Sequence, residues 1–217
     1  MRIILIGPSG SGKGTLANYI HSDFEIPHIS TGDLFRRNIF LKTELGRQAE
    51  DLVNKGQWVP DEITIKMLME RISEDDAKSG FVLEGCPRTL NQAIILDEYV
   101  KVDLVLQLDV DDEIVVDRLS GRWVCAACQK NHNIKLGPIN QCVSCRGPLY
   151  QREDDKEEYI RSRLAQYRSS SAAIINFYNK KGLVHTITVG EHEKPREVYR
   201  RVGEYFFQKG ILPQAHA

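Results

Sequence analysis

The sequence predicts a three-layer α/β/α fold, in which a five-stranded parallel sheet lies between two layers of helices. Three features of the 217 residues indicate it. Short apolar runs alternate with segments of helical apolar spacing, a glycine-rich loop joins the first run to the first helix, and one cysteine-rich insertion interrupts the alternation. A content of 41% hydrophobic and 27% charged residues is typical of a globular domain.

The sheet is expected from apolar runs that are short enough to be buried strands. Segments with helical spacing separate them, as in a parallel sheet covered on both faces. The expected strands are Arg2–Ile6, Pro27–Ser30, Gly80–Glu84, Asp103–Val110 and Leu183–Val189. Residues 31–79 are helical in pattern almost throughout and exceed what one crossover helix needs, so part of them is expected to form a small separate lobe.

The loop Gly7–Thr15 follows the first apolar run directly and has the pattern of a phosphate-binding P-loop. Its glycines permit a tight turn in which backbone N–H groups face phosphate oxygens, and Lys13 adds a cation at the helix start. Gly14 follows the lysine, so the usual hydroxyl comes one place later, at Thr15. The residues expected to bind nucleotide phosphates are Gly10, Ser11, Gly12, Lys13, Gly14 and Thr15.

The third apolar run ends in a carboxylate, Glu84, and Arg88 follows it. A strand-end carboxylate beside a P-loop is suited to hold Mg²⁺ through water, and fixed arginines stabilise the charge that spreads in phosphoryl transfer. Arginines recur in motifs expected to border the site, namely Arg36, Arg88, Arg118, Arg122, Arg152 and Arg163. The net charge of −1 argues against a duplex nucleic acid as partner.

Residues 121–151 form an inserted unit that is rich in Gly, Pro, Asn and Cys and lacks helical periodicity. Two Cys-x-x-Cys pairs, Cys125 with Cys128 and Cys142 with Cys145, lie near its ends. This spacing is typical of a closed, zinc-ribbon-like Cys₄ site with a structural role, because four protein ligands leave no position for substrate. Iron in the same cage, and free or disulfide-bonded thiols, are the alternatives.

The acidic run Asp154–Glu158 follows the insertion and precedes a segment of helical spacing. Carboxylates near a helix N-terminus are stabilised by the helix dipole, so this run is expected to begin a long helix.

The chain is expected to be cytoplasmic and to have no membrane partner. No apolar run approaches the length of a membrane span, and the first run, of five residues, is too short for a signal sequence. Four of the five cysteines fall in metal-type pairs, which suits a reducing compartment, and Cys86 is left over.

Seven motifs occur along the chain in a characteristic order. They are Gly7–Thr15, Ser30–Arg36, Gly56–Asp61, Gly85–Gln92, Asp117–Arg122, Gln151–Asp155 and Arg163–Leu164. The P-loop alone is generic, but Gly-Lys-Gly-Thr joined to Gly-x-Pro-Arg-Thr, and to Arg-x-Asp-Asp after a cysteine insertion, is highly specific. In order and spacing, over essentially the whole chain, these motifs resemble the adenylate kinase family in its long-lid bacterial form.

The resemblance implies a reversible, Mg²⁺-dependent transfer of the γ-phosphoryl group of ATP to AMP, giving two ADP, by a monomer. It also implies three parts. The core comprises residues 1–29, 60–121 and 160–217, a helical AMP-binding lobe comprises residues 30–59, and a lid with the Cys₄ site comprises residues 122–159.

The resemblance further implies roles for single residues. For ATP it adds Arg118, Arg122, His132 and Lys194 to the loop residues. For AMP it implies Thr31, Arg36, Gln57, Trp58, Val59, Gly85, Cys86, Pro87, Arg88, Gln92, Arg152 and Arg163. The expected catalytic residues are Lys13, Arg88, Arg122, Arg152 and Arg163, with Glu84 holding Mg²⁺ through water and Zn²⁺ in the lid.

The chain departs from the family's pattern at four of these positions. Glu84 stands where the family has Asp, and the longer carboxylate is still expected to hold Mg²⁺ through water. Cys86 replaces Phe and is expected to fill space in the core, with a reshaped acceptor site or a redox-sensitive thiol as the alternatives. Trp58 replaces an aliphatic residue beside the acceptor base. His132 replaces a tyrosine, and either packs near the donor adenine or ribose or displaces one thiolate at the metal.

Two alternative functions stay open. A nucleoside monophosphate kinase that prefers CMP, UMP or GMP would share the phosphate machinery, although Thr31, Arg36 and Gln92 with the zinc-type lid favour AMP. A nucleotide-gated module that binds nucleic acid through the cysteine unit is the other, but this unit lacks the aromatic residues and the dense basic stripe of such surfaces.

Overall fold

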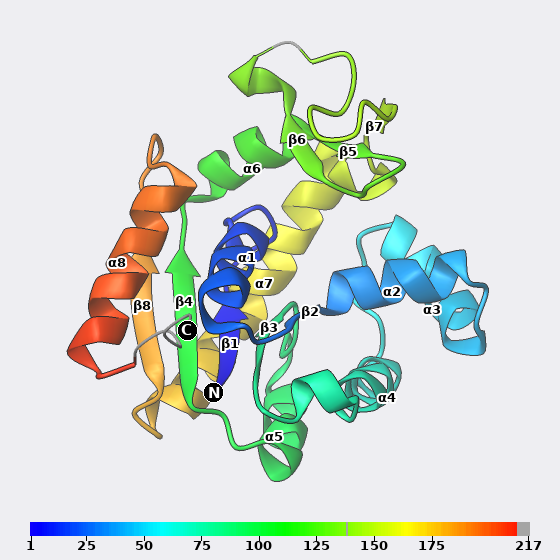
Figure 1. Cartoon of the computed structure of the whole chain (residues 1–217). Helices are drawn as coiled ribbons and strands as arrows, with labels where there is room; N and C mark the ends of the chain where they lie inside the picture. Colours follow the sequence, from blue (N-terminus) through cyan, green and yellow to red (C-terminus); the bar gives the residue numbers. More distant parts are fainter. Residues whose placement is uncertain (138, 212–217) are drawn as a thin grey trace.

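A five-stranded parallel sheet forms the centre of the molecule, as the sequence predicts (Figure 1). The computed structural model describes residues 1–137 and 139–211. In spatial order the strands are β2 (His28–Ser30), β3 (Phe81–Glu84), β1 (Arg2–Ile6), β4 (Leu104–Asp109) and β8 (Val184–Thr188). Each strand lies within one of the predicted apolar runs. Because all five are parallel, their carboxyl ends meet at one edge, where ligands of such sheets bind.

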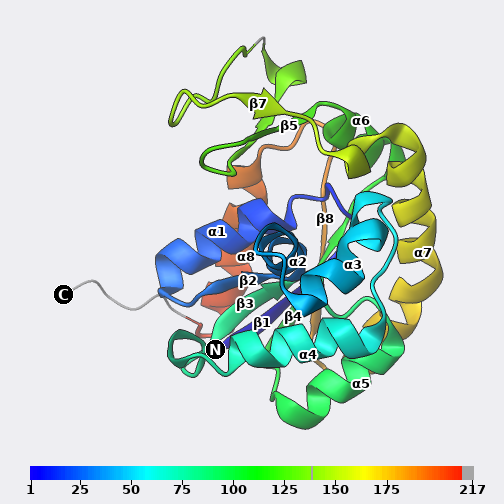
Figure 2. The same cartoon turned by 90° about the vertical axis from the view of Figure 1, so that its right-hand side faces the viewer.

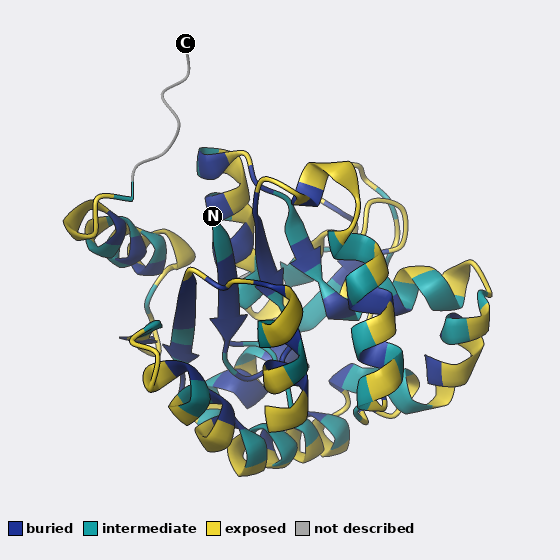
Figure 3. Cartoon of the chain, turned by 90° about the horizontal axis from the view of Figure 1, so that it is seen from below, coloured by how far each residue is buried: buried dark blue, intermediate teal, exposed yellow. Residues whose placement is uncertain are grey.

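Helices cover both faces of this sheet (Figure 2). One face is covered by α1 (Lys13–Phe24), α6 (Asp112–Ser120) and α8 (Pro195–Gln208), and the other by α4 (Asp61–Ile72), α5 (Leu90–Tyr99) and the C-terminal half of α7 (Glu157–Asn179). Alternate side chains of β1 serve the two faces: Ile3 and Leu5 pack toward α1 and α8, while Ile4 and Ile6 pack toward α4 and α5. Figure 3 shows the buried strands between helices whose outer sides are exposed.

A small helical lobe stands to one side of the sheet (Figure 1). It contains α2 (Thr31–Phe40) and α3 (Glu44–Asn54), which the sequence predicted only as part of a long helical segment. The two helices approach so closely that a Cβ on Gly46 would lie 2.2 Å from the Asn38 carbonyl oxygen. Glycine at position 46 therefore allows the two helices to pack. A single-turn helix, η1 (Asp75–Ala77), leads from α4 toward β3.

The inserted unit lies above the carboxyl edge of the main sheet and has a sheet of its own (Figure 1). Its three antiparallel strands are β6 (Asn131–Asn133), β5 (Arg122–Cys125) and β7 (Leu149–Tyr150), in that spatial order, and η2 (Ile134–Leu136) follows β6. Two cysteines, Cys125 and Cys142, are fully buried here beside Val124. So few buried apolar side chains among the described residues of this unit indicate that the sulfur cluster takes the place of a hydrophobic core.

The acidic run after the insertion forms two elements, so the prediction that all of it begins the long helix was wrong. Helix α7 begins at Glu157, and only Glu157 and Glu158 lie in its first turn. Asp154 and Asp155 lie in the preceding single-turn helix η3 (Glu153–Asp155) and pair with arginines instead. None of the helices described, α7 included, is long and apolar enough to cross a bilayer.

The substitution Gly46→Ala is expected to lower the free energy of unfolding by about 1–3 kcal/mol, because the added methyl group forces α2 and α3 apart. Urea unfolding followed by circular dichroism measures this change. Gly203→Ala in α8 is the matched control, since a Cβ there meets open space and should raise the free energy by up to about 1 kcal/mol. Equal effects of the two substitutions would contradict the role of Gly46.

Candidate functional site

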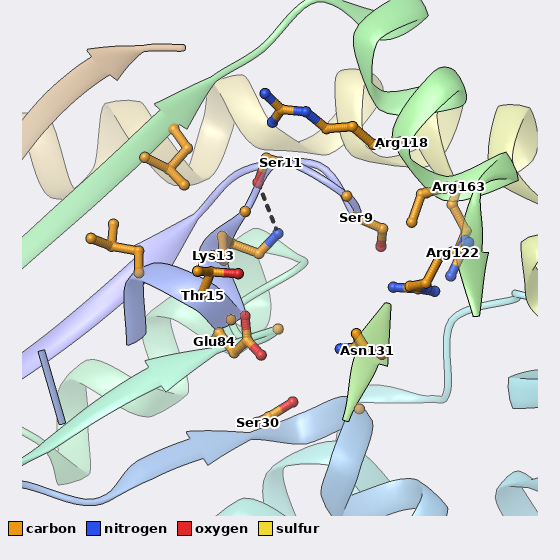
Figure 4. Close-up of a pocket in the computed structure, with 18 of the residues that line it drawn as sticks. Ser9, Ser11, Lys13, Thr15, Ser30, Glu84, Arg118, Arg122, Asn131 and Arg163 are labelled. Atoms are coloured by element: carbon orange, nitrogen blue, oxygen red, sulfur yellow. Dashed lines mark hydrogen bonds between the residues drawn. The ribbon is translucent and has the colours of Figure 1, made fainter. Parts of the chain in front are cut away.

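A cleft of about 1570 Å³ lies between the carboxyl edge of the main sheet, the helical lobe and the inserted unit. Figure 4 shows Ser11, Lys13 and Glu84 on the sheet side, with Arg122 and Asn131 across from them. The predicted residues that line it are Gly10–Thr15, Arg36, Gln57–Val59, Glu84, Gly85, Arg88, Gln92, Arg118, Arg122, His132, Arg152, Arg163 and Lys194. Three predicted residues, Thr31, Cys86 and Pro87, are buried and do not line it.

The loop after β1 encloses the amine of Lys13. The backbone turns through left-handed conformations at Gly10 and Gly12, with φ of 85° and 99°, and α1 begins at Lys13. Lys13 Nζ donates to the carbonyl oxygens of Gly7 at 2.8 Å and Pro8 at 2.7 Å, and to Ser11 Oγ at 3.3 Å (Figure 4). The loop therefore places a cation at a helix N-terminus whose first N–H groups have no partners within the helix.

Positive charge around Lys13 exceeds the negative charge that balances it. Burial, with a further contribution from Arg88, Arg163 and Arg122, lowers the pKa of Lys13 to about 8, although Glu84 opposes the shift. Such a depressed lysine pKa means that the charged amine is destabilised in the free site, chiefly by burial and further by nearby cations. A bound polyanion would relieve this destabilisation, so the electrostatics of the cleft favour a phosphate-rich ligand.

Glu84 lies directly against the loop at Gly14. A Cβ on Gly14 would be 3.3 Å from Glu84 Oε1, so glycine at this position leaves room for the carboxylate. His28 Nε2 lies 3.2 Å from the same oxygen, and Asn18 Oδ1 lies 3.0 Å from His28 Nδ1. Burial would raise the pKa of Glu84, but His28 and Lys13 lower it, so the carboxylate is charged. Sequence reasoning missed His28 because only the register of β2 with β3 brings it to Glu84.

Two arginines of the cleft are paired with the carboxylates of η3. Arg122 binds Asp155 through two hydrogen bonds of 2.7 and 2.5 Å, and the Asp155 side chain is fully buried. Arg163 donates to Asp154 Oδ2 at 2.5 Å and to the Asp154 carbonyl oxygen at 2.7 Å. These bidentate contacts fix the two guanidinium groups at the cleft. The Arg-x-Asp-Asp motif was the available signal for them.

Two other arginines of the cleft, Arg152 and Arg88, have no carboxylate paired with them to balance their charge among the described residues. Burial, followed by repulsion from Arg36 and Arg122, lowers the pKa of Arg152 to about 10. The Nε atom of Arg152 is buried without a partner among the described residues, and its Nη2 donates to Asn131 Oδ1 at 3.5 Å. Burial and Arg163 likewise lower the pKa of Arg88, whose Nε donates to Gly85 O at 2.8 Å. Both groups would gain by binding an anion.

The remaining predicted arginines lie at opposite ends of the cleft. Arg36, on α2, pairs with Asp33 one helical turn before it. Arg118, on α6, donates from Nη2 to the Gly190 carbonyl oxygen at 3.5 Å, and burial lowers its pKa. Arg118 therefore lies near the loop before α8, which carries Lys194.

Gln92 is held by a network centred on Asp61. Its Nε2 donates to Asp61 Oδ1 at 2.7 Å, and its Oε1 accepts from the Arg88 backbone N–H at 2.7 Å. Thr89 Oγ1 donates to the other Asp61 oxygen at 2.8 Å and caps helix α5. The network joins the start of α4 to the start of α5 and fixes the backbone at Arg88. The sequence placed Asp61 in one of the recognised motifs, but only the tertiary structure shows which side chains it binds.

Cys86 packs beneath this network. Its Sγ donates to Gln92 Oε1 at 3.5 Å, and burial raises the pKa of the thiol to about 12. A buried thiol with so high a pKa is unreactive and acts as a small apolar side chain.

The four paired cysteines of the inserted unit form one cluster. The sulfur atoms of Cys125, Cys128, Cys142 and Cys145 all lie within 4.8 Å of one another, and none is in a disulfide. Four thiolates around Zn²⁺ at ~2.3 Å would stand a little under 4 Å apart, so the cluster fits this ion. A Cβ on Gly147 would lie 3.0 Å from Cys125 Sγ, so glycine is needed beside the cluster.

Backbone N–H groups point at the sulfur atoms. The Cys128 N–H donates to Cys125 Sγ at 3.4 Å and lowers the pKa of Cys125. Burial would raise the pKa of Cys142, but the N–H groups of Cys145 and Ser144 lower it to about 5. Thiolates are the form that binds a metal, so the backbone prepares these two cysteines for an ion. His132 Nε2 lies 3.3 Å from Cys142 Sγ, and the four sulfurs form the cluster without it.

Comparison with known proteins gives one consistent result. The family model described as adenylate kinase matches residues 5–183. The adenylate kinase of Finegoldia magna is 48% identical over 195 residues, which cover 86% of this chain and 91% of the relative. That of Clostridium kluyveri is 45% identical over 195 residues (86% and 90%), and that of Caldicellulosiruptor saccharolyticus is 43% identical over 214 residues (94% and 99%).

Binding of inorganic triphosphate at about pH 8.5 is expected to be accompanied by proton uptake. Because the pKa of Lys13 in the free protein is about 8, most of its amine is neutral at this pH, and a bound anion would raise the pKa and recharge it. The affinity for triphosphate should fall as the pH rises above the pKa of Lys13. Titration calorimetry in two buffers of different ionisation enthalpy measures the protons taken up.

Lys13→Arg provides the control for this measurement. Its guanidinium stays charged at every accessible pH, so triphosphate should bind to the variant with less proton uptake than to the parent chain. Triphosphate itself can take up protons, and this contribution to the measured uptake is the same for both chains. Equal uptake by the two chains would contradict the assignment to Lys13.

Proposed function

The chain belongs to the adenylate kinase family, and on that basis we propose that it transfers the γ-phosphoryl group of ATP to AMP, reversibly, giving two ADP. The observation that carries this proposal is the convergence of incompletely balanced, buried cations on one large cleft. Lys13, Arg88 and Arg152 come from three separate segments of the chain and all have lowered pKa values. The cleft exceeds the ~300–1000 Å³ of a typical single-ligand pocket, which supports two nucleotides rather than one.

We assign the donor nucleotide to the end of the cleft that the P-loop forms. The backbone N–H groups of Gly10–Thr15 would bind the phosphates, and Arg118, Lys194 and His132, which line the same cleft, would contact the base and ribose. The charged Glu84 carboxylate beside Gly14 is suited to hold Mg²⁺ through water. When bound, that ion would neutralise phosphate charge and orient the transferred group.

We assign the acceptor to the end that the helical lobe forms. Arg36 and Arg88 would bind the AMP phosphate, and the segment Gln57–Val59 lines the same end of the cleft, together with Gln92. The three buried residues Thr31, Cys86 and Pro87 would act by shaping this end rather than by contacting AMP. Thr31 Oγ1, for instance, donates to the Glu84 carbonyl oxygen at 3.4 Å.

Transfer would be direct, from one bound nucleotide to the other. Arginines and Lys13 would stabilise the negative charge that spreads over the phosphoryl oxygens in the transition state, and no residue needs to form a covalent intermediate. The ion pairs of Arg122 with Asp155 and of Arg163 with Asp154 would preorganise two of these charges. Exclusion of water would suppress hydrolysis of ATP, which is the function proposed for the lid of residues 122–159.

We infer a structural Zn²⁺ in this lid, held by Cys125, Cys128, Cys142 and Cys145. The division into a core, an AMP-binding lobe of residues 30–59 and this lid is part of the same proposal. That the chain acts as a cytoplasmic monomer without nucleic-acid or membrane partners stays a prediction, and its mass in solution tests the oligomeric part.

ADP formation from ATP is expected to be fastest with AMP among AMP, CMP, UMP and GMP. Arg88→Ala should lower the rate by about 100- to 1000-fold, because one fixed cation is lost from the transition state. A coupled assay for ADP measures both effects.

Arg200→Ala is the control, since Arg200 lies on the exposed side of α8 and pairs only with Glu204 among the described residues. Its rate should match that of the parent chain. Faster transfer to CMP, UMP or GMP would overturn the choice of AMP, and no transfer to any acceptor would overturn the enzymatic proposal.

The purified protein is expected to contain zinc in stoichiometric amount. Removal of the metal by a chelator should lower the midpoint of thermal unfolding, because the inserted unit has little buried apolar surface to replace the metal. Elemental analysis for zinc and iron, together with calorimetry, measures these outcomes. Cys142→Ser should lose the metal, whereas Cys86→Ala should retain it. A metal-free native protein would contradict the prediction, and iron in place of zinc would correct the ion.

A further inference from the structure

His132 lies at the boundary between the four-cysteine cluster and the nucleotide cleft. Its Nε2 is 3.3 Å from the sulfur of Cys142, which is fully buried. The same side chain lines the cleft and is only partly buried. It belongs to β6, which is an edge strand of the lid sheet. One imidazole thus contacts both sites.

The contact with Cys142 is suited to stabilise a metal-bound thiolate. With the proton on Nε2, the imidazole donates to a sulfur that already accepts the Ser144 N–H at 3.4 Å. Donors to a ligand atom spread its charge and hold its direction, and their removal commonly weakens metal binding by ~10–100-fold. The tyrosine expected from the family at this position has a longer side chain and a hydroxyl in place of the ring nitrogen.

The strand that carries His132 also contacts two arginines of the cleft. Asn131 Oδ1 accepts from Arg152 Nη2 at 3.5 Å, and Asn133 Nδ2 donates to the Arg118 carbonyl oxygen at 3.4 Å. In the pairing with β5, His132 stands opposite Trp123, so the two asparagines lie on the other face of the strand. A shift of β6 would therefore act both on the sulfur cluster and on the Arg152 guanidinium and the Arg118 backbone.

We propose that His132 is a positioning residue that couples the metal centre of the lid to the binding of the donor nucleotide. The imidazole holds the Cys142 thiolate and thereby fixes β6 as a wall of the cleft. This inference rests on the proposed function for the identity of the nucleotide. Because linkage between two ligands is reciprocal, a metal that strengthens nucleotide binding must itself be held more tightly when the nucleotide is bound.

The first test compares the release of Zn²⁺ to a chromogenic chelator from the parent chain and from three variants. His132→Phe keeps a planar ring without a donor and should release zinc ~10–100-fold faster. His132→Gln retains an N–H donor, and its rate of zinc release should lie between the rates of His132→Phe and the parent chain. Val143→Ala is the control, because Val143 is exposed beside Cys142, and it should match the parent chain. Equal release by His132→Phe and the parent chain would overturn the proposal.

The second test uses chains loaded with Co²⁺, whose sulfur-to-metal charge-transfer band reports the electron density on the thiolates. Loss of the imidazole donor should shift this band in His132→Phe, and His132→Gln should restore it in part. A role limited to packing would leave the band unchanged, and an unchanged band would overturn the proposed contact.

The third test measures the coupling itself. Saturating non-hydrolysable ATP analogue, without acceptor, should slow zinc release from the parent chain and have no such effect on His132→Phe. If His132→Phe does not fold, the same measurement on the parent chain and on His132→Gln tests the coupling. A rate of zinc release that the ATP analogue leaves unchanged in both chains would overturn it.

The phosphoryl-transfer assay separates this inference from the proposed function. If the protein forms ADP but substitution of His132 leaves the rate of zinc release unchanged, only the proposed coupling is overturned. A chain that makes no ADP with any acceptor would overturn the proposed function, while a His132-dependent band and release rate would still support the metal contact.

Discussion

Buried positive charge at the carboxyl edge of the sheet is the constraint on which the rest of the site depends. Lys13, Arg88 and Arg152 are held where their own charges are destabilised, as their lowered pKa values indicate. Desolvation of a charge is costly unless a partner offsets it. The carboxylates of Glu84 and Asp155 offset part of this cost, and the remainder is available to be relieved by phosphate. The free protein is thus preorganised for an anion that it does not itself supply.

The scaffold tolerates this strain because the charges are attached to well-packed elements. Lys13 begins α1, whose Leu16 and Ala17 pack against the sheet, and Arg88 is tied through its backbone to Gln92 and thus to Asp61. The two units on either side of the cleft are built differently. The helical lobe has a small apolar core, whereas the lid has a sulfur cluster in its place, so the proposed Zn²⁺ would stabilise the lid more than packing does.

The two ends of the cleft differ in the groups that line them. The end that we assign to the donor offers backbone N–H groups and a single amine, which suit a chain of phosphates. The end that we assign to the acceptor offers arginine, glutamine and tryptophan side chains, which would suit one phosphate and a base. In the described structure both ends of the Gln92 carboxamide are engaged, by Asp61 and by the Arg88 backbone, so under the proposed assignment the segment Gln57–Val59 would contribute to recognition of the acceptor base.

Local chemistry let the sequence alone predict the sheet, the P-loop and the cysteine cluster. Apolar runs, glycines that permit left-handed backbone, and Cys-x-x-Cys spacing act over a few residues, so their consequences can be read along the chain. Only the tertiary structure decided which distant side chains meet. The register of β2 and β3 brings His28 to Glu84, the fold of η3 turns Asp155 onto Arg122 rather than into the helix dipole, and β6 places His132 on Cys142. Such contacts depend on sequence separations that periodicity does not encode.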